Sequence, residues 1–236
     1  MTKIRIPNID HLPTSPQPAA TVSLETIAYH EAGHALVSHY YHRKVYSAEL
    51  KAANSNSADK PTNNNRTTNN RATNNSVRFE PNQYLKYLLQ GKHDPSHYWP
   101  QALEQTLVTV RILLGGPVAQ AFHQQIPFEK IDGSDDYRTI VKTLLLLERL
   151  RLNYSELHDA DQSHRKPHVL DTLTSDVKYI INNRHHLPLL ENVANALLEK
   201  NSLNTDEISV LLKPMRRSNH IQEIRRRLIS RRQPPK

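Results

Sequence analysis

His30 and His34, four residues apart in the run His30-Glu31-Ala32-Gly33-His34, constrain this chain more than any other feature of its sequence. On an α-helix, residues at this spacing project from one face, so both imidazoles can bind one metal ion. Glu31 lies about a quarter-turn further round, where its carboxylate can contact a metal-bound water. Two histidines with a glutamate directly after the first are typical of zinc-dependent hydrolysis. The pattern therefore predicts a helix at this point of the fold.

The surrounding sequence favours such a helix over residues 24–41. Ser23 is a suitable N-cap, and no proline occurs between positions 19 and 60. An apolar stripe runs beside the two histidines, which places them near the core, where a metal is shielded from bulk water. Gly33 costs about 1 kcal/mol of helix stability relative to Ala. Such a cost makes sense if another part of the chain must approach the helix closely.

The chain contains no cysteine, so disulfides and thiolate metal ligands are excluded. Any zinc ion must therefore be held by histidine and carboxylate, with one position open for water. The third ligand is expected from an acidic helix start, in which Asp132, Asp135 and Asp136 are all candidates. On the other interpretation, these carboxylates only cap the helix and complement its dipole.

At 236 residues the chain is long enough for one ordinary domain with appendages. Its hydrophobic content of 37% and mean hydropathy of -0.68 are low, so part of the chain is expected to be unfolded. Residues 1–22, with four prolines, are predicted to form an extended leader. Residues 52–76 are rich in asparagine and lack large apolar side chains, which predicts a disordered insert. The domain itself is expected to span residues 23–212.

The remaining segments predict a mainly α fold with a small β-hairpin. β-Forming residues at 45–50 and 76–80 flank the insert, so the two strands should pair across it. A helix from Pro100 is expected to bend or break at Gly115-Gly116-Pro117 and to continue to His123. Further helices are expected at 83–89, from 132 to about 151, and at 174–184, 187–200 and 205–212.

The net charge of +8 belongs to the C-terminal segment. Residues 213–236 contain nine Lys and Arg and one Glu, so the rest of the chain is neutral. This basic tail lacks interleaved aromatic residues, so nucleic acid is not the expected partner. Binding of the tail to nucleic acid or to an anionic membrane stays an alternative hypothesis. The sequence shows no signal peptide and no apolar run long enough for a membrane helix, so we expect a soluble, cytoplasmic protein.

Several segments occur in the order found in a known family. Together the region 24–212 resembles the peptidase domain of the FtsH-type ATP-dependent zinc proteases. Residues 28–37 are very similar to that family's zinc helix, and Leu113-Leu114-Gly115-Gly116 is similar to its Leu-Gly-Gly segment. Ser134-Asp135-Asp136 aligns without a gap on a segment whose Asp is the third zinc ligand. Two further segments, Leu190–Lys200 and Thr205–Ile208, are similar to the family's closing helices.

The resemblance implies a helical, zincin-like fold in which His30, His34 and Asp136 bind Zn2+ and Glu31 is the general base. It implies a zinc metalloendopeptidase that cleaves unfolded polypeptide segments. The chain has no Gly-x-x-x-x-Gly-Lys-Ser/Thr phosphate loop, so a separate ATPase partner is expected if substrates must be unfolded. By analogy with the family, a homo-oligomeric ring is also expected.

An interpretation without catalysis stays open beside this one. Gln120-Ala121 stands where the family usually has acidic residues, which changes the groups that support the metal ligands. Together with the missing ATPase module, this difference favours a non-catalytic, zinc-binding module that binds other proteins through the same groove.

The other histidines are not expected to bind a metal. Pro95 lies between His93 and His97, which favours a loop rather than a regular helix there. His39 falls well off the arc of the two ligand histidines and is expected to be a packed side chain. The His- and Asp-rich segment at 158–168 is expected to be a solvated loop.

Overall fold

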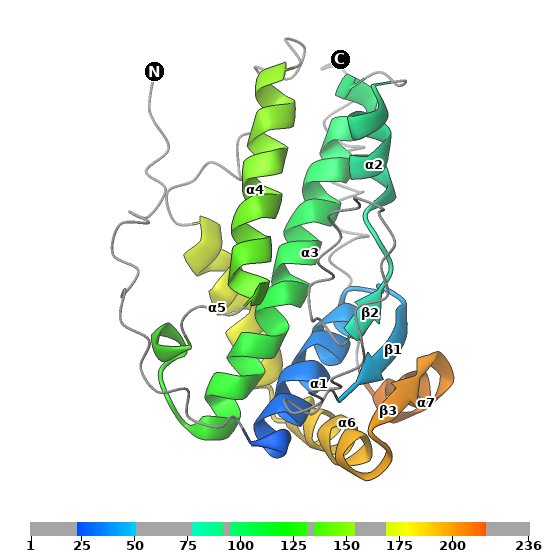
Figure 1. Ribbon diagram of the computed structural model, residues 1–236, viewed down its shortest axis with the longest axis vertical. Helices are drawn as coiled ribbons and strands as arrows, with labels where there is room; N and C mark the ends of the chain where they lie inside the picture. Colours follow the sequence, from blue (N-terminus) through cyan, green and yellow to red (C-terminus); the bar gives the residue numbers. More distant parts are fainter. Residues whose placement is uncertain (1–22, 51–76, 92–94, 132–134, 154–168, 216–236) are drawn as a thin grey trace, which may run out of the picture.

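The computed structural model describes residues 23–50, 77–91, 95–131, 135–153 and 169–215. In this part of the chain the fold is mainly α-helical with a small antiparallel sheet, as predicted (Figure 1). The predicted leader, the asparagine-rich insert, the segment 158–168 and nearly all of the basic tail lie outside the described residues. Within the described ranges, no helix combines the length and the apolar character that a membrane crossing requires.

The first helix is followed by the two strands of a hairpin, and all the other described helices come after these strands. In chain order the elements are α1 (Leu24–Tyr40), β1 (Val45–Glu49), β2 (Val77–Phe79), α2 (Gln83–Gln90), α3 (Pro95–Gln124), a short 3-10 helix (Phe128–Lys130), α4 (Asp135–Asn153), α5 (Val169–Ile181), α6 (Leu187–Lys200), β3 (Ser202–Asn204) and α7 (Thr205–Leu212).

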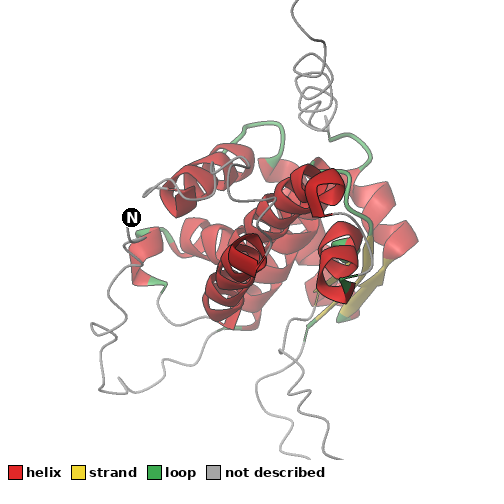
Figure 2. Ribbon diagram, turned by 90° about the horizontal axis from the view of Figure 1, so that it is seen from above, coloured by secondary structure: helices red, strands yellow, loops and turns green. Residues whose placement is uncertain are grey.

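Helix α1 lies at the centre of the fold. It packs against α3 and α6, and the sheet lies beside it through β1 (Figure 1). Helices α4 and α5 pack against α3, and the view from above shows the strands at the edge of the helical bundle (Figure 2). Every residue from Glu31 to His39 is consequently buried. A helix surrounded in this way can hold polar groups only if they are paired with one another or with a cation.

Local sequence accounts for where α1 begins. The Ser23 hydroxyl accepts a hydrogen bond from the Thr26 backbone N–H at 3.1 Å, which is the N-cap predicted from the sequence. The helix then runs without interruption to Tyr40, one residue short of the predicted end. His39 has 7% of its surface exposed, so the prediction of a packed side chain is confirmed.

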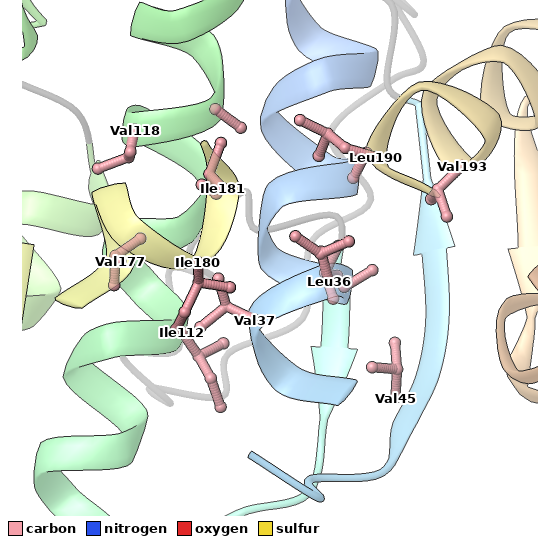
Figure 3. Packing of buried hydrophobic residues seen from close by; sticks show 14 of the residues in the cluster. Leu36, Val37, Val45, Ile112, Val118, Val177, Ile180, Ile181, Leu190 and Val193 are labelled. Atoms are coloured by element: carbon pink, nitrogen blue, oxygen red, sulfur yellow. The ribbon is translucent and has the colours of Figure 1, made fainter. Parts of the chain in front are cut away.

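The main hydrophobic core fills the space between α1 and the helices around it (Figure 3). From α1, Val37 lies beside Ile112 of α3 and Ile180 of α5, and all three side chains have at most 2% of their surface exposed. On the other side of α1, Leu190 and Val193 of α6 contribute to the same cluster. Burial of each such side chain contributes roughly 1.5–3 kcal/mol, which makes this cluster the main support of α1.

The described strands form one antiparallel sheet in the order β2-β1-β3. Val45 pairs with Phe79 and Ala48 with Val77, so the predicted hairpin across the insert is confirmed. The third strand was not predicted from the sequence. On the other edge of β1, Ala48 pairs with Leu203, whose side chain has 2% of its surface exposed. Three residues are too few for an alternating pattern to be recognised in a sequence.

Helix α3 corrects two expectations. The predicted bend or break at Gly115-Gly116-Pro117 was wrong as a break, because the helix is continuous from Pro95 to Gln124. The prediction of a loop around Pro95 was also wrong in part. Helix α3 begins at Pro95, because the first turn of a helix tolerates proline, and His97 lies in that turn. His93 lies outside the described residues. In this helix, Pro95 therefore marks the start and Gly115 marks a packing contact, and neither residue ends the helix.

One glycine of α1 and one glycine of α3 form the contact between these two helices. A Cβ atom built on Gly33 would overlap the carbonyl oxygen of Gly115 and would lie 2.6 Å from the Ala119 Cβ. Conversely, a Cβ atom on Gly115 would lie 2.7 Å from the carbonyl oxygen of Gly33. The sequence-based inference that something approaches Gly33 closely is confirmed. Absence of both side chains lets the two backbones meet directly.

We expect Gly33→Ala to destabilise the fold. Helix propensity alone would stabilise α1 by roughly 1 kcal/mol. The added methyl group meets a backbone oxygen that cannot rotate away, however, and such overpacking costs about 1–3 kcal/mol. Thermal unfolding followed by circular dichroism should therefore show a lower Tm than the parent protein. Asn195→Ala at an exposed position of α6 is the control and should leave Tm nearly unchanged. A higher Tm for Gly33→Ala would contradict the close helix contact.

Candidate metal centre

Side chains from two helices converge beside the contact between α1 and α3. His30 and His34 of α1 bring their Nε2 atoms to 3.1 Å from one another. Asp136 of α4 places Oδ2 at 2.9 Å from His30 Nε2 and 3.4 Å from His34 Nε2. These potential ligand atoms all lie within 4.8 Å of one another. The structure thus brings together the three residues predicted as zinc ligands, 106 positions apart in the case of His30 and Asp136.

Burial separates two of the three aspartates that spacing in the sequence left as alternatives. Asp136 has 3% of its surface exposed and faces the two imidazoles. Asp135 is exposed and accepts a hydrogen bond from the Arg138 guanidinium at 3.2 Å, within the first turn of α4. Asp132 lies outside the described residues. Of the two described aspartates, only Asp136 is therefore available to a metal ion.

Each imidazole is oriented by a hydrogen bond on its other ring nitrogen. His34 Nδ1 lies 2.7 Å from the backbone carbonyl oxygen of Ile112, and His30 Nδ1 lies 3.1 Å from Gln120 Oε1. Both partners are oxygen acceptors, so each Nδ1 carries the hydrogen and donates it. The two Nε2 atoms then present lone pairs to a carboxylate oxygen. Three such atoms converge stably only around a proton or a metal cation.

Two buried carboxylate oxygens at this place have no hydrogen-bond partner among the described residues. They are Oε2 of Glu31 and Oδ1 of Asp136, and Glu31 has 6% of its surface exposed. Buried polar atoms are nearly always hydrogen-bonded, so such orphaned oxygens call for an ion or an ordered water. Two imidazole nitrogens and one carboxylate oxygen are the donor set of a catalytic zinc ion. On both counts the residues present fit a zinc ion.

The backbone of α3 forms one wall of the site at Gly116. A Cβ atom built on this residue would lie 2.6 Å from His30 Nε2 and closer still to His34 Nε2. Any larger residue here would occupy the space between the helix and the two Nε2 atoms. Sequence reasoning missed this role, because it interpreted the Gly-Gly pair as a helix breaker. The resemblance had marked the pair as a motif, and that was the signal that pointed to it.

The charges within the cluster shift the pKa values of its members in opposite directions. Burial acts to lower the pKa of His34, but the Asp136 carboxylate outweighs burial and raises that pKa to about 9. Burial acts to raise the pKa of Asp136, but the neighbouring imidazoles hold it well below its usual range. Without metal, a proton on His34 therefore supplies the positive charge that the cluster requires.

Histidines elsewhere do not form a second centre in the described part of the chain. His186 is buried, and its Nδ1 donates a hydrogen bond to the carbonyl oxygen of Ile180 at 2.9 Å. It thus supplies a partner for a backbone carbonyl in the last turn of α5. The group of His30, His34 and Asp136 is the one set of three or more potential ligands that converges among the described residues. Their role as metal ligands stays a prediction.

Neither the scan against protein-family models nor the search of curated protein sequences finds a match. The resemblance to the FtsH-type peptidase domain therefore stays a prediction that rests on the motifs and on the geometry described above.

Zinc affinity is expected to rise with pH. Zinc requires neutral imidazole, whereas His34 of the metal-free protein stays protonated up to its pKa of about 9. Affinity should therefore increase about tenfold per pH unit between pH 7 and about 9, and then level off. Competition with a chromophoric chelator, corrected for the protonation of the chelator, measures this slope.

Asp136→Asn provides the control for this pH dependence. Without the carboxylate, the cause of the raised pKa of His34 is removed, so weaker zinc binding should level off at a lower pH than in the parent. Equal affinities at pH 7 and pH 9 in the parent would contradict the proposed competition between proton and metal.

Proposed function

We propose that this protein is a zinc-dependent endopeptidase that cleaves peptide bonds in unfolded protein segments. The observation that carries the proposal is the convergence of His30 Nε2, His34 Nε2 and Asp136 Oδ2 beside a buried carboxylate, Glu31, with an unpartnered oxygen. This combination is the one that a metal-dependent hydrolase requires: two imidazoles, a carboxylate ligand and a separate base.

The chemistry divides between the ion and the chain. A zinc ion held by His30, His34 and Asp136 would polarise the scissile carbonyl and acidify the attacking water. Glu31 Oε2 would accept the proton of that water and deliver it to the leaving amine nitrogen. The oxygen has no competing hydrogen-bond donor among the described residues, which leaves it available for proton transfer. Helix α1 keeps Glu31 next to the ligand histidines throughout.

The burial of the site supports unfolded substrates. The His34 and Asp136 side chains have 3% and 4% of their surface exposed, whereas the His30 side chain reaches 17%. Access is thus greatest at His30, and the rigid surface of a folded protein cannot bring a peptide bond into so enclosed a site. An extended, flexible segment can. A separate ATPase that unfolds and delivers such segments is the corresponding partner, and a homo-oligomeric ring remains part of the proposal by analogy.

Glu31→Gln is expected to abolish proteolysis while zinc remains bound. The amide cannot accept a proton, and loss of a general base typically lowers turnover about 10²–10⁴-fold. Degradation of casein, measured by release of soluble peptides, and zinc content, measured by atomic absorption, are the two readouts. Glu25→Gln, the same change at an exposed carboxylate of the first turn of α1, should leave both unchanged.

Each outcome of this pair of measurements decides between interpretations. Proteolysis that persists in Glu31→Gln would refute the assigned base. Stoichiometric zinc in a parent protein that degrades no unfolded substrate would favour the non-catalytic, zinc-binding interaction module instead. A parent protein that binds no zinc would refute both the endopeptidase and the zinc-binding module.

A further inference from the structure

We propose that Gln120 is a positioning residue whose neutral amide oxygen orients His30 for metal binding. The inference deepens the proposed zinc site and rests on it. The distance between His30 Nδ1 and Gln120 Oε1 is 3.1 Å, across 90 positions of sequence. Gln120 lies in α3, on the helix that already supplies the partner of the other histidine.

One face of α3 contacts both histidines of the site. Ile112, Gly116 and Gln120 follow one another at intervals of four residues and therefore lie along one side of the helix. Ile112 contributes its backbone carbonyl to His34, and Gly116 contributes the absence of a side chain beside both Nε2 atoms. Gln120 contributes an amide oxygen to His30. Ile112 and Gly116 act through the backbone alone, and Gln120 acts through its side chain.

His30 depends on its hydrogen bond more than His34 does. The His34 side chain has 3% of its surface exposed, so both the surrounding packing and the hydrogen bond to Ile112 hold its ring in place. The His30 side chain has 17% exposed and lies where access to the site is greatest. Without an acceptor at Nδ1, this ring is free to adopt the other tautomer, which places a hydrogen on Nε2 and removes the lone pair that a metal needs.

The amide also leaves the charge of the site balanced. A divalent cation would face two negative charges, the carboxylates of Asp136 and Glu31. In many zinc sites the partner of a ligand histidine is a carboxylate, which raises the basicity of the ring. A carboxylate at position 120 would keep the acceptor and add a third negative charge, so it should hold zinc at least as tightly as the amide does. This expectation tests whether the acceptor oxygen, rather than the neutral amide NH2 group, is the feature of Gln120 that the site requires.

Position 124 offers a matched control on the same helix. Gln124 lies one turn beyond Gln120, and its amide nitrogen contacts only the Thr26 hydroxyl, at 3.5 Å, among the hydrogen bonds described for it. The same substitution can therefore be made twice on α3, once at a residue that contacts a ligand histidine and once at a residue that does not.

The test compares zinc affinity in the parent, Gln120→Leu, Gln120→Glu and Gln124→Leu, by competition with a chromophoric chelator. Leucine keeps much of the side-chain volume but accepts no hydrogen bond, so Gln120→Leu should lose about 10–100-fold in affinity. Gln124→Leu should stay within about twofold of the parent, and Gln120→Glu should match or exceed it. The visible spectrum of the cobalt-loaded protein should change in Gln120→Leu and not in Gln124→Leu.

Parent-like affinity and an unchanged cobalt spectrum in Gln120→Leu would overturn the inference. So would an affinity of Gln120→Glu as low as that of Gln120→Leu, because an oxygen acceptor at position 120 would then not be the feature that the site requires. Failure of the zinc site itself would be distinguishable, since the parent would then bind no zinc in the same titration. Circular dichroism of each metal-free variant ensures that only folded proteins are compared.

Discussion

The backbone contact between Gly33 and Gly115 is the interaction on which the rest of the structure depends. It brings α1 and α3 closer together than any pair of side chains at these positions would permit. Only at this separation can Ile112 accept the hydrogen bond of His34, and only then does Gly116 lie beside the Nε2 atoms of both histidines. The same close approach places Gln120 at His30. Helix packing and site geometry are thus one arrangement, and the glycines that weaken each helix locally are required for both.

Electrostatics makes this arrangement conditional on a positive charge. The core around α1 holds two carboxylates, Glu31 and Asp136, each with a buried oxygen that lacks a partner among the described residues. The apolar cluster on the other faces of α1 supplies the burial energy that keeps such groups in place. In the metal-free protein the raised pKa of His34 lets a proton provide the compensating charge. A metal ion would provide more of it, so metal binding and stability of this region should be linked.

Agreement between the predicted and observed elements is closest where the signals are local. Helices α6 and α7 begin and end at the predicted residues, and α1 differs from its prediction by one residue at its end. The predicted and observed elements differ where packing outweighs the preference of the local sequence. Gly115-Gly116-Pro117 has every feature of a helix breaker, yet the contact with α1 keeps α3 continuous through it. Strand β3 was missed because its three residues become a strand only through pairing with β1.

The sequence by itself determined that His30, Glu31 and His34 share one helix, because their spacing and the cap at Ser23 are properties of a single continuous segment. It also limited the candidates for a third metal ligand to a short acidic stretch. Of these candidates the resemblance implies Asp136, and the tertiary structure buries Asp136 beside the two imidazoles and leaves Asp135 exposed, because one side of α4 faces α1. Tertiary structure alone decided that Gln120 is the partner of His30. Contacts between separate helices follow from how closely and at what angle they pack, and no local pattern in a single sequence encodes that geometry.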